Sequence, residues 1–320
     1  MSITITTGGI TMTGGGVTFS SVPPPSVATA GWFQGGATPG ITSRVQRITF
    51  VTDTSTASIR GPLTSTRQFA GAAGNFEYAW IGGGWTPATV SSVDRVTYAT
   101  DTATATTRGP LSIARARLSA TGNTTDGWFA GGVPAGTVVD RITYASDTAT
   151  ASVRGPLSAP EWFPGSATGT ATQGWFAGGA TPSPATMFST VQRITYATDT
   201  AATSIRGPLS TAVVQSGATT DNTTYGWFGG GSQIPSAVAY STVERITYAT
   251  DTAATSIRGP LSIDKRALAA ACSTEYGWFG GGYVTSNIDR IEYATDTATA
   301  STRGPLNVAT GNLTGTAGAQ

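Results

Sequence analysis

Histidine is absent from the 320-residue chain, and lysine and cysteine occur once each, as Lys265 and Cys272. Without histidine the chain lacks the commonest general base and the commonest metal ligand, so we expect no metal and no cofactor. A single cysteine forms no disulfide within the chain and does not suffice for a zinc site. These absences predict a protein that is not an enzyme.

Charge and long apolar runs are scarce as well. Charged residues make up 11% of the chain, and the formal net charge is +1. Binding to nucleic acid needs a basic surface that neutralises phosphates, so we expect no nucleic-acid partner. No apolar run approaches the ~18 residues of a membrane span, so we expect no membrane insertion, and the first residues do not read as a secretory signal.

Three short sequence motifs repeat along the chain in a fixed order. Arg-Gly-Pro-Leu begins at Arg60, Arg108, Arg154, Arg206, Arg258 and Arg303; Trp-(Phe/Ile)-x-Gly-Gly begins at Trp32, Trp80, Trp128, Trp175, Trp227 and Trp278; Arg-(Ile/Val)-(Thr/Glu)-(Tyr/Phe) begins at Arg47, Arg95, Arg141, Arg193, Arg245 and Arg290. In all six copies the arginine of Arg-Gly-Pro-Leu follows the arginine of the third motif by 13 residues. The repeat period is 45 to 52 residues. A period of this length indicates a repeat architecture.

Each repeat contains four strand-sized pieces, which in the third copy are residues 117–121, 127–131, 139–145 and 149–154. The third piece alternates apolar and polar residues, as a half-buried strand does. Runs of Gly, Asn, Asp and Ser separate the pieces, as turns should. Four antiparallel strands in every period predict an all-β fold, namely a propeller of six four-stranded blades.

The order of these features resembles the kelch-type β-propeller. Phe129-Ala130-Gly131-Gly132 is followed by Tyr144 with a polar turn, and then by Pro156. The chain departs from the kelch pattern in two places. Trp-Phe stands before the Gly pair, and Ile, Val or Thr precedes Arg-Gly-Pro-Leu. The resemblance covers residues 30–316 and implies kelch-like blades that differ from standard kelch blades.

The ends of the repeat array predict how the ring closes. The first repeat has no clear innermost strand before Gly31, whereas the last repeat continues past Leu306. We therefore expect residues 307–315 to supply the innermost strand of the first blade, which removes the open edge of the ring. The expected domains are an anchor at residues 1–20, a proline-rich linker at 21–29 and the propeller at 30–320.

The N-terminal segment, residues 2–20, has a different pattern of three short alternating strands joined by glycines. Its apolar positions, which we expect to form the anchor, are Ile3, Ile5, Ile10, Met12, Val17 and Phe19. So short a segment cannot bury a core alone. It either pairs with another chain or is a disordered leader, and the strict alternation favours pairing.

The repeating charged residues occupy the same place in every blade. They are the arginines of the two Arg-containing motifs and the aspartates Asp53, Asp101, Asp147, Asp199, Asp251 and Asp296. A ring of guanidinium groups suits an anion. Identical placement in all six blades nevertheless favours structural Arg–Asp or Arg–carbonyl bonds between blades. The Trp-Phe pairs are likewise expected to pack between blades.

Residues that break the six-fold pattern are the candidate binding residues. They fall in the loop between the second and third strands, or at the connection between blades, and an up-and-down blade places both on one face. The predicted binding residues are Trp85, Met187, Phe188, Ile234, Tyr240, Tyr283, Arg67, Arg115, Arg117, Trp162, Lys265 and Arg266, and Glu161 adjoins them. Variable loop length, aromatics and unpatterned charge suit a protein or sugar contact. Loop drift without a function is the alternative.

Near-identical blades, abundant Thr, Gly and Ala, scarce Lys and a Gly-spaced β leader resemble virion proteins of tailed bacteriophages, particularly cyanophages. The resemblance implies a multicopy virion structural or host-attachment protein of the tail or a capsid fibre. Residues 2–20 would dock it to other virion proteins, and its propeller would contact another virion protein or a host-surface carbohydrate. The alternatives are a free-standing carbohydrate- or protein-binding propeller in the cytoplasm or on the surface of a bacterium, and a glycosidase or sialidase-like enzyme.

Overall fold

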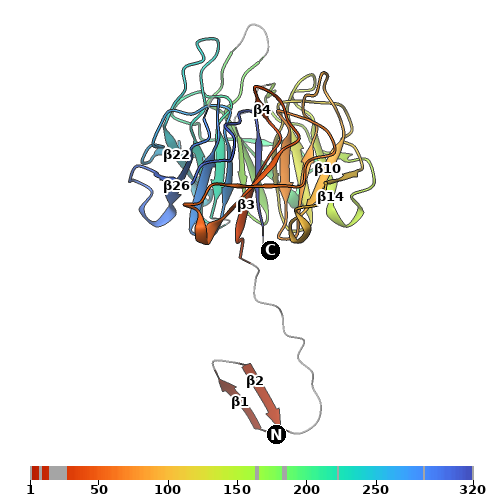
Figure 1. The fold of residues 1–320 in the computed structure, drawn as a ribbon, viewed down its shortest axis with the longest axis vertical. Helices are drawn as coiled ribbons and strands as arrows, with labels where there is room; N and C mark the ends of the chain where they lie inside the picture. The colour runs from red at the N-terminus through yellow and green to blue at the C-terminus, as the bar shows by residue number, and fades with distance from the viewer. Residues whose placement is uncertain are drawn as a thin grey trace.

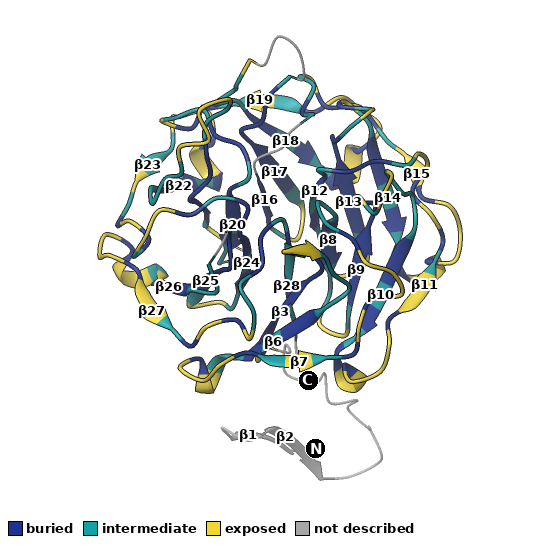
Figure 2. Cartoon of the chain, turned by 45° about the horizontal axis from the view of Figure 1, so that its top comes forward, coloured by how far each residue is buried: buried dark blue, intermediate teal, exposed yellow. Residues whose placement is uncertain are grey.

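Six four-stranded antiparallel sheets surround a central axis (Figures 1 and 2). The structure is a computed structural model that describes residues 2–6, 9–13, 27–162, 166–181, 186–221, 223–283 and 285–318. The predicted all-β, six-bladed propeller is thereby confirmed.

Each blade runs outward from the axis through four strand positions. The innermost strands, of blades 1 to 6 in order, are β28 (Thr314–Gly318), β8 (Gly71–Gly74), β12 (Ser119–Gly122), β16 (Ser166–Gly169), β20 (Gly217–Thr220) and β24 (Ala269–Cys272). The second strands are β3 (Ala30–Gln34), β9 (Tyr78–Gly82), β13 (Asp126–Ala130), β17 (Gln173–Ala177), β21 (Tyr225–Gly229) and β25 (Tyr276–Gly280). The third are β6 (Val45–Thr49), β10 (Val93–Thr97), β14 (Val139–Thr143), β18 (Val191–Thr195), β22 (Val243–Thr247) and β26 (Ile288–Glu292). The outermost are β7 (Ser58–Arg60), β11 (Thr106–Arg108), β15 (Ser152–Val153), β19 (Ser204–Arg206), β23 (Ser256–Ile257) and β27 (Ser301–Arg303).

Short 3-10 turns follow the third strands and hold the repeating Tyr-Ala-Thr and related sequences. They are η1 (Phe50–Thr52), η2 (Tyr98–Thr100), η3 (Tyr144–Ser146), η4 (Tyr196–Thr198), η5 (Tyr248–Thr250) and η6 (Tyr293–Thr295). The predicted third strand of residues 139–145 is shorter in the structure, because β14 ends at Thr143 and Tyr144 begins η3. A two-stranded sheet of β4 (Ala37–Thr38) and β5 (Gly40–Ile41) interrupts the loop of blade 1.

The ring closes through the C-terminal strand. β28 pairs antiparallel with β3, from Thr314 opposite Gln34 to Gly318 opposite Ala30. The last strand of the chain is therefore the innermost strand of the blade whose other strands come first in the propeller. This confirms the predicted closure, although the strand begins somewhat later than residues 307–315. The pairing covers the inner edge of β3, which would otherwise lack a strand partner.

The strand sequences follow from where each strand lies. Second strands are enclosed on both faces, and their tryptophans are at most 1% exposed. Third strands bury Val and Ile and leave Arg and Thr half-buried, which is the alternation that the sequence showed. Six innermost strands meet around one axis, so their central positions carry only small residues, namely Ala72, Ala120, Ala167, Ala218, Ala270 and Gly315. Figure 2 shows these strands around the middle of the ring.

Neighbouring blades are joined by a polar cluster, which we call the inter-blade clasp. Between blades 1 and 2, Asp101 Oδ2 accepts hydrogen bonds from Trp32 Nε1 at 2.8 Å and from Arg47 Nη1 at 3.2 Å. Arg60 Nε lies 3.4 Å from the same oxygen as an ion pair. The Asp side chain is 5% exposed. One carboxylate thus accepts two hydrogen bonds from the preceding blade and forms an ion pair with its second arginine.

The clasp recurs at all six junctions. The other five aspartates, with the Trp and two Arg of the preceding blade, are Asp147 (Trp80, Arg95, Arg108), Asp199 (Trp128, Arg141, Arg154), Asp251 (Trp175, Arg193, Arg206), Asp296 (Trp227, Arg245, Arg258) and Asp53 (Trp278, Arg290, Arg303). The last of these joins blade 6 to blade 1. The predicted structural role of the repeating arginines and aspartates is confirmed.

Aromatic stacking reinforces each junction. Trp80 stacks on Tyr144 of the next blade with ring centroids 3.8 Å apart, and Trp278 stacks on Phe50 at 3.9 Å across the closing junction. The Arg-Gly-Pro-Leu glycine permits the close approach, because a Cβ on Gly61 would lie 1.9 Å from the carbonyl oxygen of Ala103 in the next blade. The Trp-Phe pairs therefore pack between blades as predicted.

The N-terminal segment contains a β-hairpin. β1 (Ser2–Thr6) and β2 (Gly9–Thr13) pair antiparallel, with Ile3 opposite Met12 and Ile5 opposite Ile10. Two of the three strands predicted for residues 2–20 are thus present. The third, with Val17 and Phe19, lies outside the described residues.

Candidate functional site

One face of the ring carries both the loops between second and third strands and the connections between blades. Backbone pairs join the two kinds of segment, as between Gln68 and Trp85, Ala116 and Val133, and Val214 and Ser232. We call this the loop face. Its existence was predicted from the up-and-down order of the strands, and the candidate binding residues come from its loops and connections.

Four of the candidate residues are not on the surface. Each lies seven residues after the arginine of Arg-Gly-Pro-Leu, at a place that we call the connector position. Arg67 and Arg115 are 0% exposed, and Glu161 and Lys265 are 1% exposed. The expectation that they face a partner is therefore wrong, and these residues belong to the interior of their blades.

The buried cations at the connector position pair with aspartates of the third strand. Arg115 Nη2 lies 2.8 Å from Asp140, and Lys265 Nζ lies 3.1 Å from Asp289. Arg67 makes the same pair with Asp94 at 3.2 Å. Each cation also donates to backbone carbonyls, so Arg115 reaches those of Gly131 and Val138. The cations thus tie the loop face to the blade below it.

The remaining blades fill the connector position without a cation, and the third-strand partner differs accordingly. Glu161 Oε1 accepts a hydrogen bond from Gln192 Nε2 at 2.8 Å, and Thr310 faces Gln46. Val213 occupies the position in blade 5 and is 7% exposed. The third-strand residue of blade 5 is nevertheless an acid, because Glu244, 5% exposed, accepts hydrogen bonds from Ser210 and Thr255 instead of facing a cation. A buried acid is thus matched either by a cation or by hydrogen-bond donors.

Burial shifts the titration of two of these groups in opposite directions. Desolvation raises the pKa of Glu161 to about 8, and the hydrogen bond from Gln192 opposes that rise only partly. Desolvation lowers the pKa of Lys265 to about 8, against the opposing effect of Asp289. The Glu161 carboxyl is therefore largely protonated at neutral pH, as a neutral member of a polar pair.

The other candidates do lie on the loop face, and those of blades 4 to 6 are linked. Ile234 donates its backbone N–H to Met187 Sδ at 3.2 Å. The Arg266 guanidinium lies over the Tyr283 ring, 4.7 Å from its centroid, and donates to the carbonyl of Ala237. Phe188 and Tyr240 are half-buried between these loops. Among the large side chains of this sector Tyr283 protrudes most, at 59% exposed.

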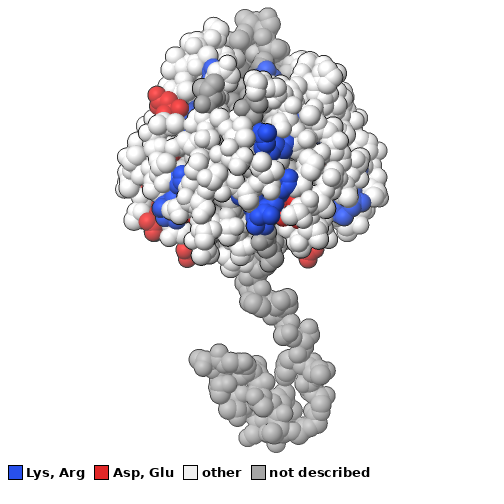
Figure 3. Space-filling model, viewed as in Figure 1, with Lys and Arg blue, Asp and Glu red and all other residues white. Residues whose placement is uncertain are grey.

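Two tryptophans are further candidates on the loop face, one in blade 2 and one in the connection to blade 4. Trp85 is 41% exposed and pairs through its backbone with Gln68. Trp162 is half-buried and covers Gly136, where an added Cβ would meet its ring. The structure thus brings together Met187, Ile234, Arg266 and Tyr283, with Trp162 bonded through its backbone to Ala180, the pairing partner of Met187, while Trp85 lies in blade 2. Figure 3 shows how few charged atoms reach the side of the molecule that it draws.

A feature that sequence reasoning missed surrounds the axis on this face. Nine residues after each Arg-Gly-Pro-Leu arginine the backbone turns left-handed, with φ of 57° to 65° at Phe69, Arg117, Gln215, Ala267 and Asn312. The sixth such position, 163, lies outside the described residues. Only Asn among these residues adopts this conformation readily. A glycine would have signalled the turn in the sequence, and none stands there.

Backbone hydrogen bonds connect these residues into an arc, which we call the axial arc. Arg117 donates to the carbonyl of Phe69, Phe69 to that of Asn312, Asn312 to that of Ala267 and Ala267 to that of Gln215, at 2.7 to 3.0 Å. The left-handed turn aims each N–H at its neighbour. The bonds use only main-chain atoms, so the side chain at each position is not fixed by the arc.

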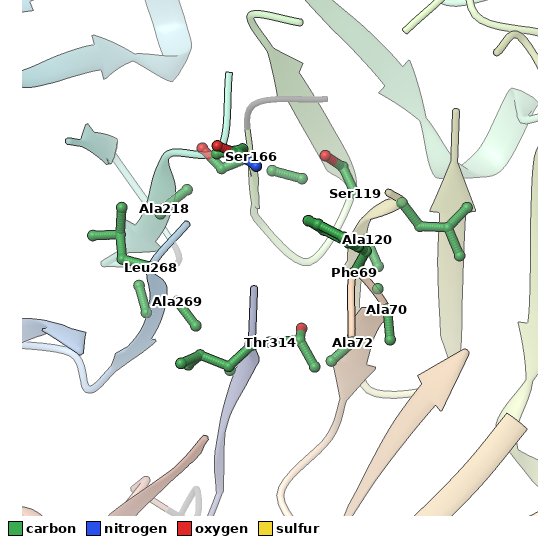
Figure 4. Close-up of a pocket in the computed structure, with 18 of the residues that line it drawn as sticks. Phe69, Ala70, Ala72, Ser119, Ala120, Ser166, Ala218, Leu268, Ala269 and Thr314 are labelled. Carbon is green, nitrogen blue, oxygen red and sulfur yellow. The ribbon is translucent and has the colours of Figure 1, made fainter. Parts of the chain in front are cut away.

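Below the axial arc lies a pocket in the central channel. It encloses about 140 Å³ and is lined by the arc, by Ser119, Ser166 and Thr314, and by alanines of the innermost strands. Figure 4 shows the labelled side chains around the opening, contributed by strands from several blades. A second cavity of about 360 Å³ opens at the other end of the channel and is lined mainly by Ala, Gly and Thr.

Comparison with models of known protein families finds no match, and comparison with curated proteins finds none either. The structure itself defines the class, a six-bladed β-propeller of four-stranded antiparallel blades. Among the described residues no helix is long and apolar enough to cross a membrane. Within that same part of the chain, no three His, Cys, Asp or Glu side chains gather as a metal-binding group.

Proposed function

We propose that this protein is a non-enzymatic virion structural or attachment protein, docked to a phage particle by its N-terminal segment. Its loop face contacts another virion protein or a host-surface glycan. The proposal places the protein in the virion, in many copies. The observation that supports it is that the repeating and the non-repeating residues lie in different places. Twelve repeating arginines lie in the clasps, whereas the exposed aromatics that do not repeat lie on the loop face.

The proposed contact surface is smaller than the sequence suggested. It keeps Trp85 and Tyr283, with 41% and 59% of their surface exposed, and the Arg266 guanidinium over the Tyr283 ring. It excludes the buried connector residues. Aromatic and arginine side chains of this kind dominate binding energy at protein interfaces, and aromatic rings also stack on sugars.

The docking half of the proposal is supported by the N-terminal hairpin. Its register sets Ile3 against Met12 and Ile5 against Ile10, with threonines between them. A two-stranded hairpin is marginal alone in water, so a partner that adds strands would stabilise it.

Particle incorporation tests the docking half. Tagged full-length chain and chain lacking residues 2–20 are supplied during particle assembly, and each is quantified in purified particles. Incorporation of the full chain only is expected. A matched pair, Ile3→Thr/Ile5→Thr and Thr4→Ser/Thr6→Ser, separates loss of the apolar positions from any change in the segment. Equal incorporation of the truncated chain contradicts the docking role.

Binding to isolated glycans tests the contact half. The full chain is applied to a glycan array together with Trp85→Ala and Tyr283→Ala, and released sugar is measured in parallel. Retained glycans that depend on these residues support the contact. Release of sugar would instead favour the alternative of a glycosidase or sialidase-like enzyme.

The alternative function is a free-standing carbohydrate- or protein-binding propeller from a bacterium, in the cytoplasm or on the cell surface. It shares the loop face but needs no docking segment. Genes that neighbour the coding sequence separate the two, since virion genes are expected only for the leading proposal.

The kelch-like character of the blades also belongs to this proposal. The Gly pair after each second strand is left-handed in the structure, as at Gly83 (φ 66°) and Gly84 (φ 111°). Such a pair supports the kelch-like interpretation, because it turns the chain from the second strand into the loop.

A further inference from the structure

The pocket under the axial arc has the size of one small ring. Its volume of about 140 Å³ is close to that of the ~150 Å³ apolar cavity that holds one benzene molecule. Small side chains set this size, because Ala72, Ala120 and Ala218 face the axis where longer chains would fill it. The opening lies on the loop face, so a ligand enters from solvent.

One charged side chain lines the pocket within the described part of the chain, and it is cationic. The Arg117 guanidinium lies over the Phe69 ring, 4.3 Å from its centroid, at the rim. Burial lowers the pKa of this guanidinium. Arginine nevertheless stays charged in proteins, and its planar fork matches a carboxylate. Asp and Glu do not occur among the described lining residues, so the pocket favours an anion.

A buried hydroxyl in the pocket adds a second polar group. Ser119 is 5% exposed and lines the pocket two residues after Arg117. Its Oγ has no hydrogen-bond partner among the described residues. In the neighbouring blades Ser166 Oγ and Ser216 Oγ bond to each other at 2.9 Å. An unpartnered buried hydroxyl is costly unless a ligand or water satisfies it.

The arc does not require an arginine at position 117. The equivalent positions carry Phe69, Gln215, Ala267 and Asn312 and make the same backbone hydrogen bonds. The backbone bonds of the arc therefore form without a guanidinium at this position. At this position, which lines the pocket, near-identical blades carry different residues.

We propose that the pocket binds a carboxylate carried on a single six-membered ring. Arg117 binds the carboxylate, Ser119 hydrogen-bonds to it or to a ring substituent, and the ring rests on the alanines of the innermost strands. The inference goes beyond the proposed function, because the pocket is separate from Trp85 and Tyr283 and exists whether or not the protein belongs to a particle.

Ligand-observed NMR titration of the full chain tests the proposal. The probes are benzoate and glucuronate, with benzyl alcohol and glucose as neutral counterparts of the same ring. Saturable binding of at least one carboxylate in the millimolar range is expected, with its neutral counterpart at least about tenfold weaker. The pair that binds shows whether the ring is aromatic or a sugar.

Substitutions locate the site. Arg117→Gln, which copies Gln215 at the equivalent position, is expected to weaken carboxylate binding at least about tenfold. Arg44→Gln is the matched control, since Arg44 is half-buried and belongs to neither the clasps nor the pocket lining. Ser119→Ala is expected to weaken binding roughly threefold. Thermal unfolding of each variant verifies that it is folded.

Three results would overturn the proposal. They are the absence of saturable binding by both carboxylates in the millimolar range, equal binding of the carboxylate and its neutral counterpart, and unchanged affinity in folded Arg117→Gln. Loss of glycan binding through Trp85→Ala with intact carboxylate binding would instead concern only the loop-face contact. The two hypotheses therefore fail separately.

Discussion

The inter-blade clasp and the connector position are both polar and both present in every blade, yet they differ in how strictly they repeat. The clasp uses Trp, two Arg and Asp at all six junctions. The connector position holds Arg, Glu, Val, Lys or Thr, and the third-strand residue is Asp where a cation stands there, Gln with Glu or Thr, and Glu with Val. The clasp residues contact two blades at once, whereas the polar partners of the side chain at the connector position lie in its own blade.

The difference teaches where the repeat is constrained. In the clasp one Asp accepts hydrogen bonds from Trp and Arg and pairs with a second Arg, so loss of the Asp leaves three groups of the preceding blade without their partner. At the connector position one pair can be exchanged for another because both members lie in the same blade. The clasp residues, which bond across two blades, are therefore the same in every repeat. The connector residues, whose polar partners lie in their own blade, differ between repeats, provided that their polar groups are satisfied.

Breaking one clasp should have the largest effect. Asp147→Ala removes the hydrogen-bond acceptor of Trp80 and Arg95 and the ion-pair partner of Arg108, and we expect the free energy of unfolding to fall by about 3–5 kcal/mol. Denaturant unfolding measures the loss. Asp264→Ala, at an exposed position, should change it by less than about 0.5 kcal/mol. Similar losses in the two variants would contradict the role of the clasp.

Exchanging a connector pair sharpens the contrast. Arg115→Thr alone leaves Asp140 buried without its cation and should cost about 3 kcal/mol. Adding Asp140→Gln reproduces the Thr310–Gln46 pair of blade 1 and should recover about half of that loss. A double-mutant cycle by denaturant unfolding gives the coupling. Strictly additive losses would show that the pair is not exchangeable.

The pH dependence of stability probes the neutral connector pair. Because the pKa of Glu161 is raised to about 8, the folded state holds a proton that the unfolded chain loses near its ordinary value of 4.5. Stability from this group is complete below that ordinary value, falls as pH rises and is lost once pH exceeds about 8. Glu161→Gln should remove this pH dependence of the unfolding free energy, which amounts to a few kcal/mol between pH 4.5 and about 8. Glu275→Gln, at an exposed site, should retain it, and an unchanged slope in Glu161→Gln would refute the assignment.

The smallest effect is expected on the loop face. Trp85→Ala and Tyr283→Ala remove partly exposed rings that belong to neither the clasp nor the connector position, and each should change stability by less than about 1 kcal/mol. Thermal unfolding measures this. A loss comparable to that of a broken clasp would show that these rings are part of the core.

The repeat made the fold and the clasp predictable. Six copies of Trp, Arg and Asp at fixed spacings implied equivalent environments, and the missing first strand implied that the C-terminal residues complete blade 1. The candidate site was predicted only in part. Arg115 and Arg117 both break the pattern and stand two residues apart, but one is buried in a pair and the other lines the axial pocket.

Blade number, strand order and the residues of each junction were thus determined by the sequence itself, because repetition multiplies every constraint six-fold. The tertiary structure alone decided which non-repeating residues are buried, where the axial arc turns left-handed and where the channel widens into a pocket. These positions recur at fixed offsets in the repeat, but their residue types differ from blade to blade, so only the packing of the folded chain shows what each one does.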